Sequence, residues 1–85
     1  MRMLLVTGAQ LRAARALVRM EQEKLAAAAG ISAATIRNLE NTEGPLNART
    51  GTLRALQHAL EEAGVVFLGE DGGGPGVRLR APSAA

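Results

Sequence analysis

The sequence predicts a mostly α fold, with four helices followed by a C-terminal β-hairpin. First, apolar residues recur every three or four positions through most of residues 8–63, which is the period of an amphipathic helix. Second, Gly30 and Ser32 divide one helical stretch into two, because glycine ends helices and serine caps them. Third, the pattern changes after Gly64 to β-branched and alternating residues. At 85 residues the chain has room for one modest core.

The first helix is predicted to begin at about residue 8. Thr7 and Gln10 have the spacing of a capping box, in which each side chain bonds the other residue's backbone N–H. The predicted apolar stripe of this helix comprises Leu11, Ala14, Leu17 and Val18.

Residues 22–41 predict two short helices joined by a tight turn. Leu25, Ala26 and Ala29 share one face of the earlier helix. Gly30 can adopt the left-handed conformation that ends it.

The later helix of this pair has two contrasting faces. Ser32 is a strong N-cap for it, and Ile36 and Leu39 form its buried stripe. Its other face is small and polar, with Ala33, Ala34, Arg37, Asn38 and Asn41. This contrast is typical of a helix-turn-helix, whose second helix enters the major groove of DNA. A helical hairpin in an ordinary small bundle is the alternative.

A fourth helix is predicted after a loop over residues 41–49. Thr50 or Thr52 is expected to cap it, and Gly64 to end it. Its core-facing stripe is expected to be Leu53, Leu56, Leu60 and Ala63.

The hairpin is predicted from two strands, residues 65–68 and 77–80, around a glycine-rich loop. An isolated two-stranded hairpin is marginally stable in water. We therefore expect a surface beneath it, or a third strand from residues 3–6 or from a second subunit. Residues 1–64 would then form the helical domain, 65–80 the hairpin and 81–85 a disordered tail.

Composition argues against several other classes of protein. The chain has no cysteine, and its one histidine, His58, has no companion for a catalytic triad or a metal site. We therefore expect no enzymatic activity, no cofactor and no metal. The apolar run of residues 3–6 is too short for a membrane span or a signal peptide, so a cytoplasmic location and no membrane partner are expected. With Phe67 as the single aromatic residue, base stacking on RNA or single strands is disfavoured.

Charge is unevenly distributed along the chain, whose formal net charge is +2. Residues 1–60 hold eight basic and four acidic side chains, whereas residues 61–85 hold two basic and four acidic ones. The helical part therefore carries the attraction for phosphate.

Residues 7–63 resemble the Cro and phage-repressor type of helix-turn-helix, also called the lambda-repressor-like or XRE family. The residues that match the family pattern in register are Gln22, Ala26, Gly30, Ile31, Ile36, Leu39 and Glu40. The resemblance implies a protein that binds double-stranded DNA, and an ion pair between Arg15 and Glu40. The chain departs from the family at Arg19 and Glu21, where glycine and a capping serine or threonine are usual. Nothing after residue 64 resembles the fifth helix that many members have.

DNA contacts are expected around the third helix. Its groove-facing N-terminal part comprises Ser32, Ala33, Ala34, Thr35 and Asn38, and the resemblance gives base contacts to Ala33, Ala34 and Asn38. Alanine methyls can meet thymine methyls, and asparagine can bond adenine, although helix propensity alone also explains the alanines. Phosphate contacts are expected from Gln22, Arg37, Asn41 and Arg49. A merely solvated surface is the alternative for the two arginines.

The hairpin is expected to join two copies of the chain. Specific binding usually needs two helix-turn-helix units on half-sites about 34 Å apart. The expected dimer contacts are Val65, Val66, Phe67, Leu68, Val77 and Leu79, which are more apolar than a solvated strand should be. A hairpin packed only on its own fourth helix is the alternative.

The sequence thus predicts a transcriptional repressor that binds a palindromic operator as a homodimer and blocks polymerase there. One alternative is the antitoxin of a toxin–antitoxin pair, which binds its own promoter and holds a protein partner through its hairpin and tail. Another is an adaptor that has lost DNA binding.

Overall fold

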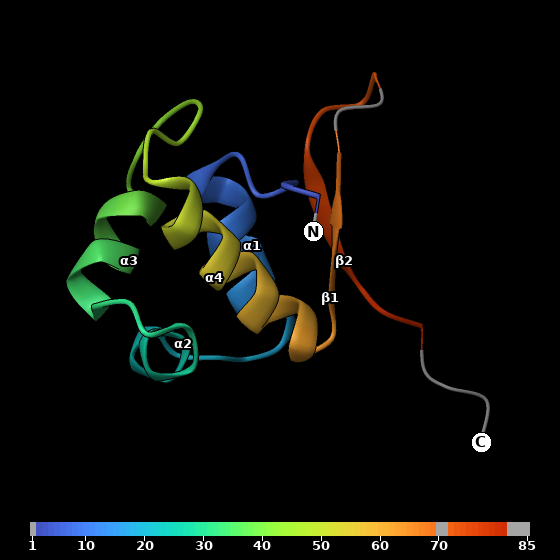
Figure 1. Cartoon of the computed structure of the whole chain (residues 1–85). Helices are drawn as coiled ribbons and strands as arrows, with labels where there is room; N and C mark the ends of the chain where they lie inside the picture. Colours follow the sequence, from blue (N-terminus) through green and yellow to red (C-terminus); the bar gives the residue numbers. More distant parts are fainter. Residues whose placement is uncertain (1, 70–71, 82–85) are drawn as a thin grey trace.

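The computed structural model describes residues 2–69 and 72–81. In this part of the chain four helices precede a two-stranded antiparallel hairpin, as predicted (Figure 1). The elements are α1 (Gly8–Leu17), α2 (Gln22–Ala29), α3 (Ala33–Glu40), α4 (Thr50–Glu62), β1 (Val65–Leu68) and β2 (Gly76–Leu79). Residues 70–71 of the predicted loop and 82–85 of the predicted tail lie outside the described residues. No helix in the described segments is long and apolar enough to cross a membrane.

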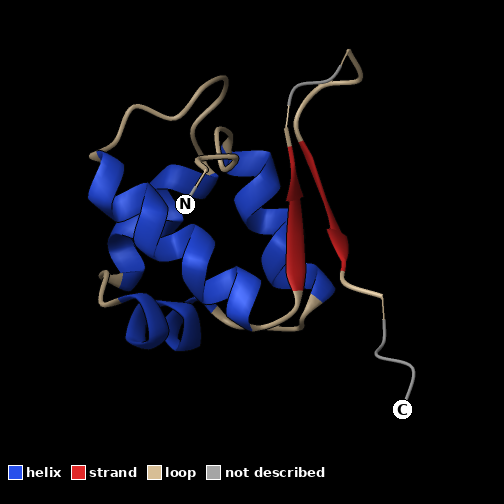
Figure 2. Cartoon of the chain, turned by 45° about the vertical axis from the view of Figure 1, so that its right-hand side comes forward, coloured by secondary structure: helices blue, strands red, loops and turns tan. Residues whose placement is uncertain are grey.

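The elements form three layers. Helices α1 and α4 make the central layer, with β2 lying against α1 and β1 against α4. Helices α2 and α3 pack on the other side of this layer, so the hairpin and α3 lie at opposite ends of the molecule (Figures 1 and 2). Whatever binds the outer side of α3 therefore faces away from the hairpin.

The helix ends follow the local sequence in most places. The capping box of Thr7 and Gln10 is formed at the start of α1. Gly30 has φ of 69° and ends α2, as predicted. Glu21 precedes α2 without a side-chain capping bond, and Arg19 adopts the left-handed φ of 53° at the position where the family usually has glycine. A non-glycine residue pays about 1–2 kcal/mol for that conformation.

The predicted cap of α4 is wrong. The helix begins at Thr50 itself, and Arg49 is the N-cap residue, with no side-chain capping bond. The reason is that the Arg49 carbonyl already accepts the first helical hydrogen bond, from the N–H of Leu53 at 3.1 Å. Thr50 is therefore inside the helix and cannot cap it.

Two predicted core residues are exposed instead. Leu17 is exposed because, at about 100° per residue, it lies roughly 120° around α1 from Leu11, whereas Val18 lies on the buried side. Ala63 is exposed because α4 ends at Glu62, so Ala63 is no longer held against the core.

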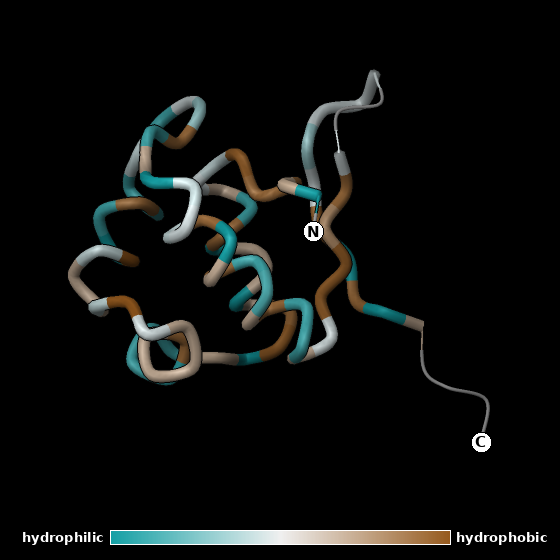
Figure 3. Tube along the Cα trace, in the orientation of Figure 1, coloured by the Kyte–Doolittle hydropathy of each residue, from teal (hydrophilic) through white to brown (hydrophobic). Residues whose placement is uncertain are grey.

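One hydrophobic core joins the helices to the hairpin. Its buried members are Leu5, Leu11, Ala14, Leu25, Ile36, Leu39, Leu56, Ala59, Leu60, Val65 and Phe67. Hydrophobic residues dominate the N-terminal arm, residues 2–6, and β1, which meet the helices from one side (Figure 3). The hairpin therefore has the supporting surface that its marginal stability requires.

The strand register sets the two faces of the hairpin. Val65 pairs with Leu79, and Phe67 pairs with Val77, so these four side chains share the face directed at the helices. β2 begins and ends one residue earlier than predicted, although the N–H of Arg80 still bonds the carbonyl of residue 64 at 2.8 Å.

The N-terminal arm does not form the third strand considered above, because the buried Gln57 takes its backbone groups. The Gln57 Oε1 accepts the N–H groups of Leu4 and Leu5 at 2.8 and 2.9 Å. Its Nε2 donates to the carbonyl of Arg2 at 2.8 Å and to the Glu61 carboxylate at 3.1 Å. All four hydrogen-bonding positions of the amide are thus used.

Gln10 does the same from α1. Its Oε1 accepts the N–H groups of Val6 and Thr7 at 2.7 and 3.0 Å. Its Nε2 donates to the carbonyls of Leu4 and Gly76 at 2.9 and 3.2 Å. This one side chain therefore connects α1, the N-terminal arm and β2.

We expect Gly8→Ala to destabilise the fold and to displace α3 from α1. A methyl group on Gly8 would collide with the backbone carbonyl of Leu39, which cannot move independently of α3. Overpacking of this kind typically costs about 1–3 kcal/mol, which urea unfolding measures directly. Gly51→Ala is the matched control, because a methyl there meets nothing within 4 Å. If both variants unfold at the parent's urea concentration, the close approach of α1 to α3 does not constrain the fold.

Candidate DNA-binding surface

The turn between α2 and α3 is fixed by short-range hydrogen bonds. The N–H of Ile31 bonds the carbonyl of Ala26 at 3.1 Å, which closes the end of α2. The Ser32 hydroxyl accepts the N–H of Thr35 at 3.1 Å, which opens α3. The chain therefore enters α3 in a single defined direction, as a recognition helix requires.

The inner side of α3 is buried and its outer side is open. Ile36, Leu39 and Glu40 are buried against the other helices. The outer side, which we call the exposed face of α3, comprises Ala34, Arg37, Asn38 and Asn41. Ala33 is half-buried at its edge. The exposed face thus carries small and polar side chains, which suits close approach to base edges.

Two of the predicted base-contacting residues also form hydrogen bonds that hold the start of α3. The Ser32 hydroxyl donates to the Thr35 Oγ1 at 2.8 Å while it accepts the capping bond, so its proton is already used. The Thr35 hydroxyl retains its own proton and is half-buried. Ser32 therefore acts first as the cap that positions α3.

The predicted phosphate contacts divide into two groups. Arg37, Asn41 and Arg49 are exposed, and they come from α3, from its C-terminal end and from the residue before α4. Gln22 is half-buried, and its Nε2 donates to the Glu40 carboxylate at 3.1 Å. Its orientation at the start of α2 is therefore set by Glu40.

Glu40 is the point where the first three helices are joined. Its side chain is only 4% exposed, and Arg15 of α1 binds both of its carboxylate oxygens, at 2.5 and 2.8 Å. A further Arg15 nitrogen donates to the carbonyl of Met20 at 2.9 Å, in the turn before α2. The structure thus brings together Arg15 and Glu40, and it adds Gln22 to the pair.

Arg15 stays protonated, and therefore charged, at any ordinary pH. Hydrogen bonding to the Glu40 carboxylate raises the pKa of Arg15, and this outweighs the desolvation that lowers it. Because the pKa is raised on folding, the stability linked to the Arg15 charge is present below arginine's ordinary pKa. It is lost only as the pH rises through the raised value, far into alkali.

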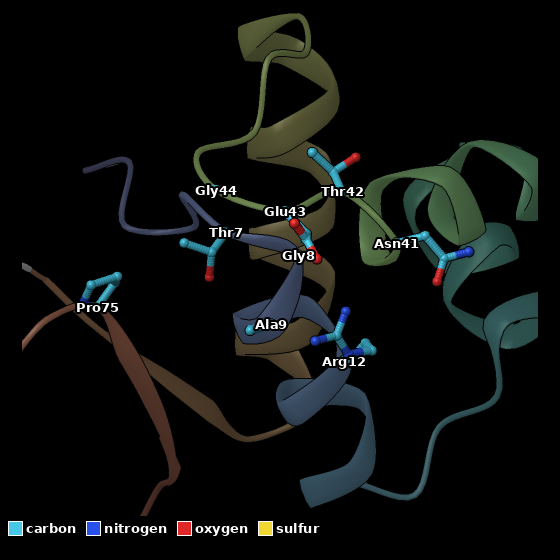
Figure 4. A pocket seen from close by; sticks show the side chains of 9 residues that line it. All are labelled: Thr7, Gly8, Ala9, Arg12, Asn41, Thr42, Glu43, Gly44 and Pro75. Atoms are coloured by element: carbon cyan, nitrogen blue, oxygen red, sulfur yellow. The ribbon is translucent and has the colours of Figure 1, made fainter.

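Arg12 is a residue near this surface that the sequence reasoning missed. Its guanidinium donates to the backbone carbonyl of Glu40, where a cation is favourable because it meets the negative end of the α3 dipole. Figure 4 shows Arg12 on α1 beside Asn41 at the end of α3, where both line an open hollow. The spacing of Arg12 and Arg15, one helical turn apart, was the available signal.

We expect Glu40→Gln to destabilise the protein by about 1–3 kcal/mol. The substitution keeps the shape but leaves Arg15, which is 21% exposed, without a charged partner. The cost stays below the 3–5 kcal/mol of a fully buried pair. Thermal or urea unfolding measures it.

Glu62→Gln is the control for this experiment. Glu62 faces His58 at 3.6 Å on the solvent side of α4, and exposed pairs contribute about 0–1 kcal/mol. Equal stability of the two variants would remove the structural role of the Arg15–Glu40 pair.

The comparisons with known proteins agree with this geometry. A helix-turn-helix family model (HTH_3) matches residues 11–61, which span α2, α3 and most of α1 and α4. A comparison with curated proteins found no match. The match covers more than half of the chain and includes every element of the surface described above. The chain therefore belongs to the lambda-repressor-like (XRE) helix-turn-helix family of DNA-binding transcription regulators.

Proposed function

We propose that this DNA-binding regulator is a cytoplasmic repressor that acts as a homodimer on a palindromic operator. It places α3 in the major groove of each half-site and excludes polymerase from the overlapping promoter. It works by binding alone, without catalysis or a cofactor. The observation that carries this proposal is the exposed face of α3, where the uncharged Ala34 and Asn38 lie beside the exposed Arg37.

Base selection in this proposal depends on Asn38. Its exposed side-chain amide can accept from adenine N6 and donate to adenine N7 at the same time. Ala33 and Ala34 contribute methyl groups, which fit thymine and keep the helix close to the base edges. A half-site read in this way would be rich in A·T pairs.

The phosphate contacts fix the position of α3 without reading sequence. Arg37 lies in the C-terminal half of α3, Asn41 at its end and Arg49 before α4, whereas Gln22 lies at the start of α2. In this proposal their partners are the phosphates of the DNA strands that border the groove. The N-terminus of α2 adds favourable N–H groups beside Gln22.

We expect Asn38→Ala to relax the preference at one base pair of each half-site. The operator is first selected from random duplex DNA with the parent protein. Affinities are then measured for that duplex and for its single-base variants, and the discrimination at one position should fall by about 1–3 kcal/mol. Asn41→Ala is the matched control and should weaken all duplexes alike. If Asn38→Ala retains the parent's preference at every position, the docking of α3 is not as proposed.

We expect Arg37→Ala and Arg49→Ala to weaken binding to every duplex. Each loss of a phosphate contact should also reduce the slope of log affinity against log salt by about one. Arg78→Ala removes an exposed arginine from β2, across the molecule from α3, and should leave the slope unchanged. Slopes equal to the parent's for both Arg37→Ala and Arg49→Ala would rule out this phosphate footprint.

A further inference from the structure

The C-terminal end of α3 is an unfavourable place for a DNA phosphate unless a cation is present there. The footprint proposed above gives a phosphate contact to Asn41, the residue that ends α3. The C-terminal end of a helix carries a partial negative charge, because the carbonyl groups of its last turn point out of the helix. A phosphate beside Asn41 would therefore be repelled unless these carbonyl groups are bonded and their charge is offset.

Every carbonyl group in the last turn of α3 has a hydrogen-bond donor. The carbonyls of residues 37–39 accept bonds from the chain just after them, namely from the N–H of Asn41 and from the N–H and hydroxyl of Thr42. The Glu40 carbonyl accepts the guanidinium of Arg12, which belongs to α1. Of these four donors the guanidinium alone carries a charge. Arg12 is therefore the cation that offsets the negative end of α3.

The Arg12 charge is not neutralised by a carboxylate. Its side chain is exposed, and within residues 2–69 and 72–81 it forms no ion pair. Arg15, one turn further along α1, is instead paired with the Glu40 carboxylate. A guanidinium also has more N–H donors than one carbonyl can use. Arg12 thus retains both charge and donors for a ligand outside the chain.

Arg12 and Asn41 line the same open hollow, between the start of α1 and the end of α3 (Figure 4). Glu43 also lines the hollow, but in the part of the chain that the structure describes no ion pair joins it to Arg12. An anion in the hollow would therefore meet a charged guanidinium from α1 and an amide from the end of α3.

We propose that Arg12 binds a DNA phosphate in this hollow together with Asn41. One guanidinium nitrogen stays on the Glu40 carbonyl while the others bond the phosphate oxygens. The end of α3 is thereby attached to the DNA backbone through α1, a helix outside the helix-turn-helix. This inference rests on the proposed function, because it adds a contact to the DNA footprint given there.

Arg12 differs from Arg37 and Arg49 because it is already held in place. The side chains of those two arginines are exposed and bond no other group in the described residues, so each must be immobilised when DNA binds. An arginine held by a backbone carbonyl loses less rotamer freedom on binding. Arg12 is therefore expected to fix the distance between the phosphate and α3 as well as to attract the phosphate.

The salt dependence of DNA binding tests this contact. We expect Arg12→Ala to weaken binding to the selected operator and to a scrambled duplex alike, about tenfold or more for each. The slope of log affinity against log salt should fall by about one. Circular dichroism checks that the variant is folded.

Arg80→Ala is the matched control. Arg80 is also exposed and also bonds a backbone carbonyl near a helix end, that of Glu61 in α4 at 2.9 Å. It follows the hairpin, across the molecule from α3, so its removal should leave both the affinity and the slope unchanged.

Arg12→Gln separates the charge from the structural hydrogen bond. Glutamine keeps an N–H donor for the Glu40 carbonyl but carries no charge. It should reduce the salt slope as Arg12→Ala does, although it stays closer to the parent in thermal stability. A role confined to closing the end of α3 would instead leave the parent's slope in this variant.

Duplexes that carry one methylphosphonate each identify the phosphate, because this group replaces a charged oxygen by a methyl group. For the parent, affinity should fall at every contacted phosphate. For Arg12→Ala, one of these positions should lose its effect, and it should differ from the position that Arg37→Ala makes silent.

The outcomes distinguish this inference from the proposed function. A parent that selects an operator, with Arg12 variants that keep its salt slope and every methylphosphonate effect, would overturn the Arg12 contact and leave the repressor standing. A parent that binds no duplex would overturn the proposed function, and the contact with it.

Discussion

The arrangement of the helices depends on the carboxylate of Glu40, on which donors from two helices, α1 and α2, converge. Arg15 binds both oxygens from α1, and Gln22 binds one of them from the start of α2. Arg12 binds the backbone carbonyl of the same residue. Because Glu40 is the last residue of α3, these bonds fix the direction of that helix at its end. The Ser32 cap fixes it at its beginning.

A second constraint lies on the other side of the central layer. There, two buried glutamines bond the backbone of the N-terminal arm, as a neighbouring strand would in a sheet. Gln10 and Gln57 satisfy the backbone of the N-terminal arm, which a sheet partner would otherwise have to do. A buried amide with every position bonded is stabilising, whereas one left partly bonded would be costly. The arm is thereby held against the helices, and within residues 2–69 and 72–81 the sheet keeps two strands.

Helix α1 belongs to both halves of the molecule. One side of it holds Glu40 and the end of α3, and another side lies beside β2. A Cβ atom at position 8 would collide with the backbone of α3, so α1 and α3 approach each other closely at Gly8. Helix α1 therefore connects the hairpin to the end of α3.

The sequence by itself determined the features that depend on near neighbours in the chain. These include the capping box at Thr7, the left-handed turn at Gly30, the Ser32 cap and the two faces of α3, because caps, turns and periodicity act within a few residues. Only the tertiary structure decided which side of the hairpin is covered and that Gln22 turns to Glu40. The bonds of Gln57 to the N-terminal arm join residues more than fifty positions apart, and no local pattern encodes such a contact. Such contacts form because each buried polar group needs a hydrogen-bonding partner, and the fold alone determines which partner is near.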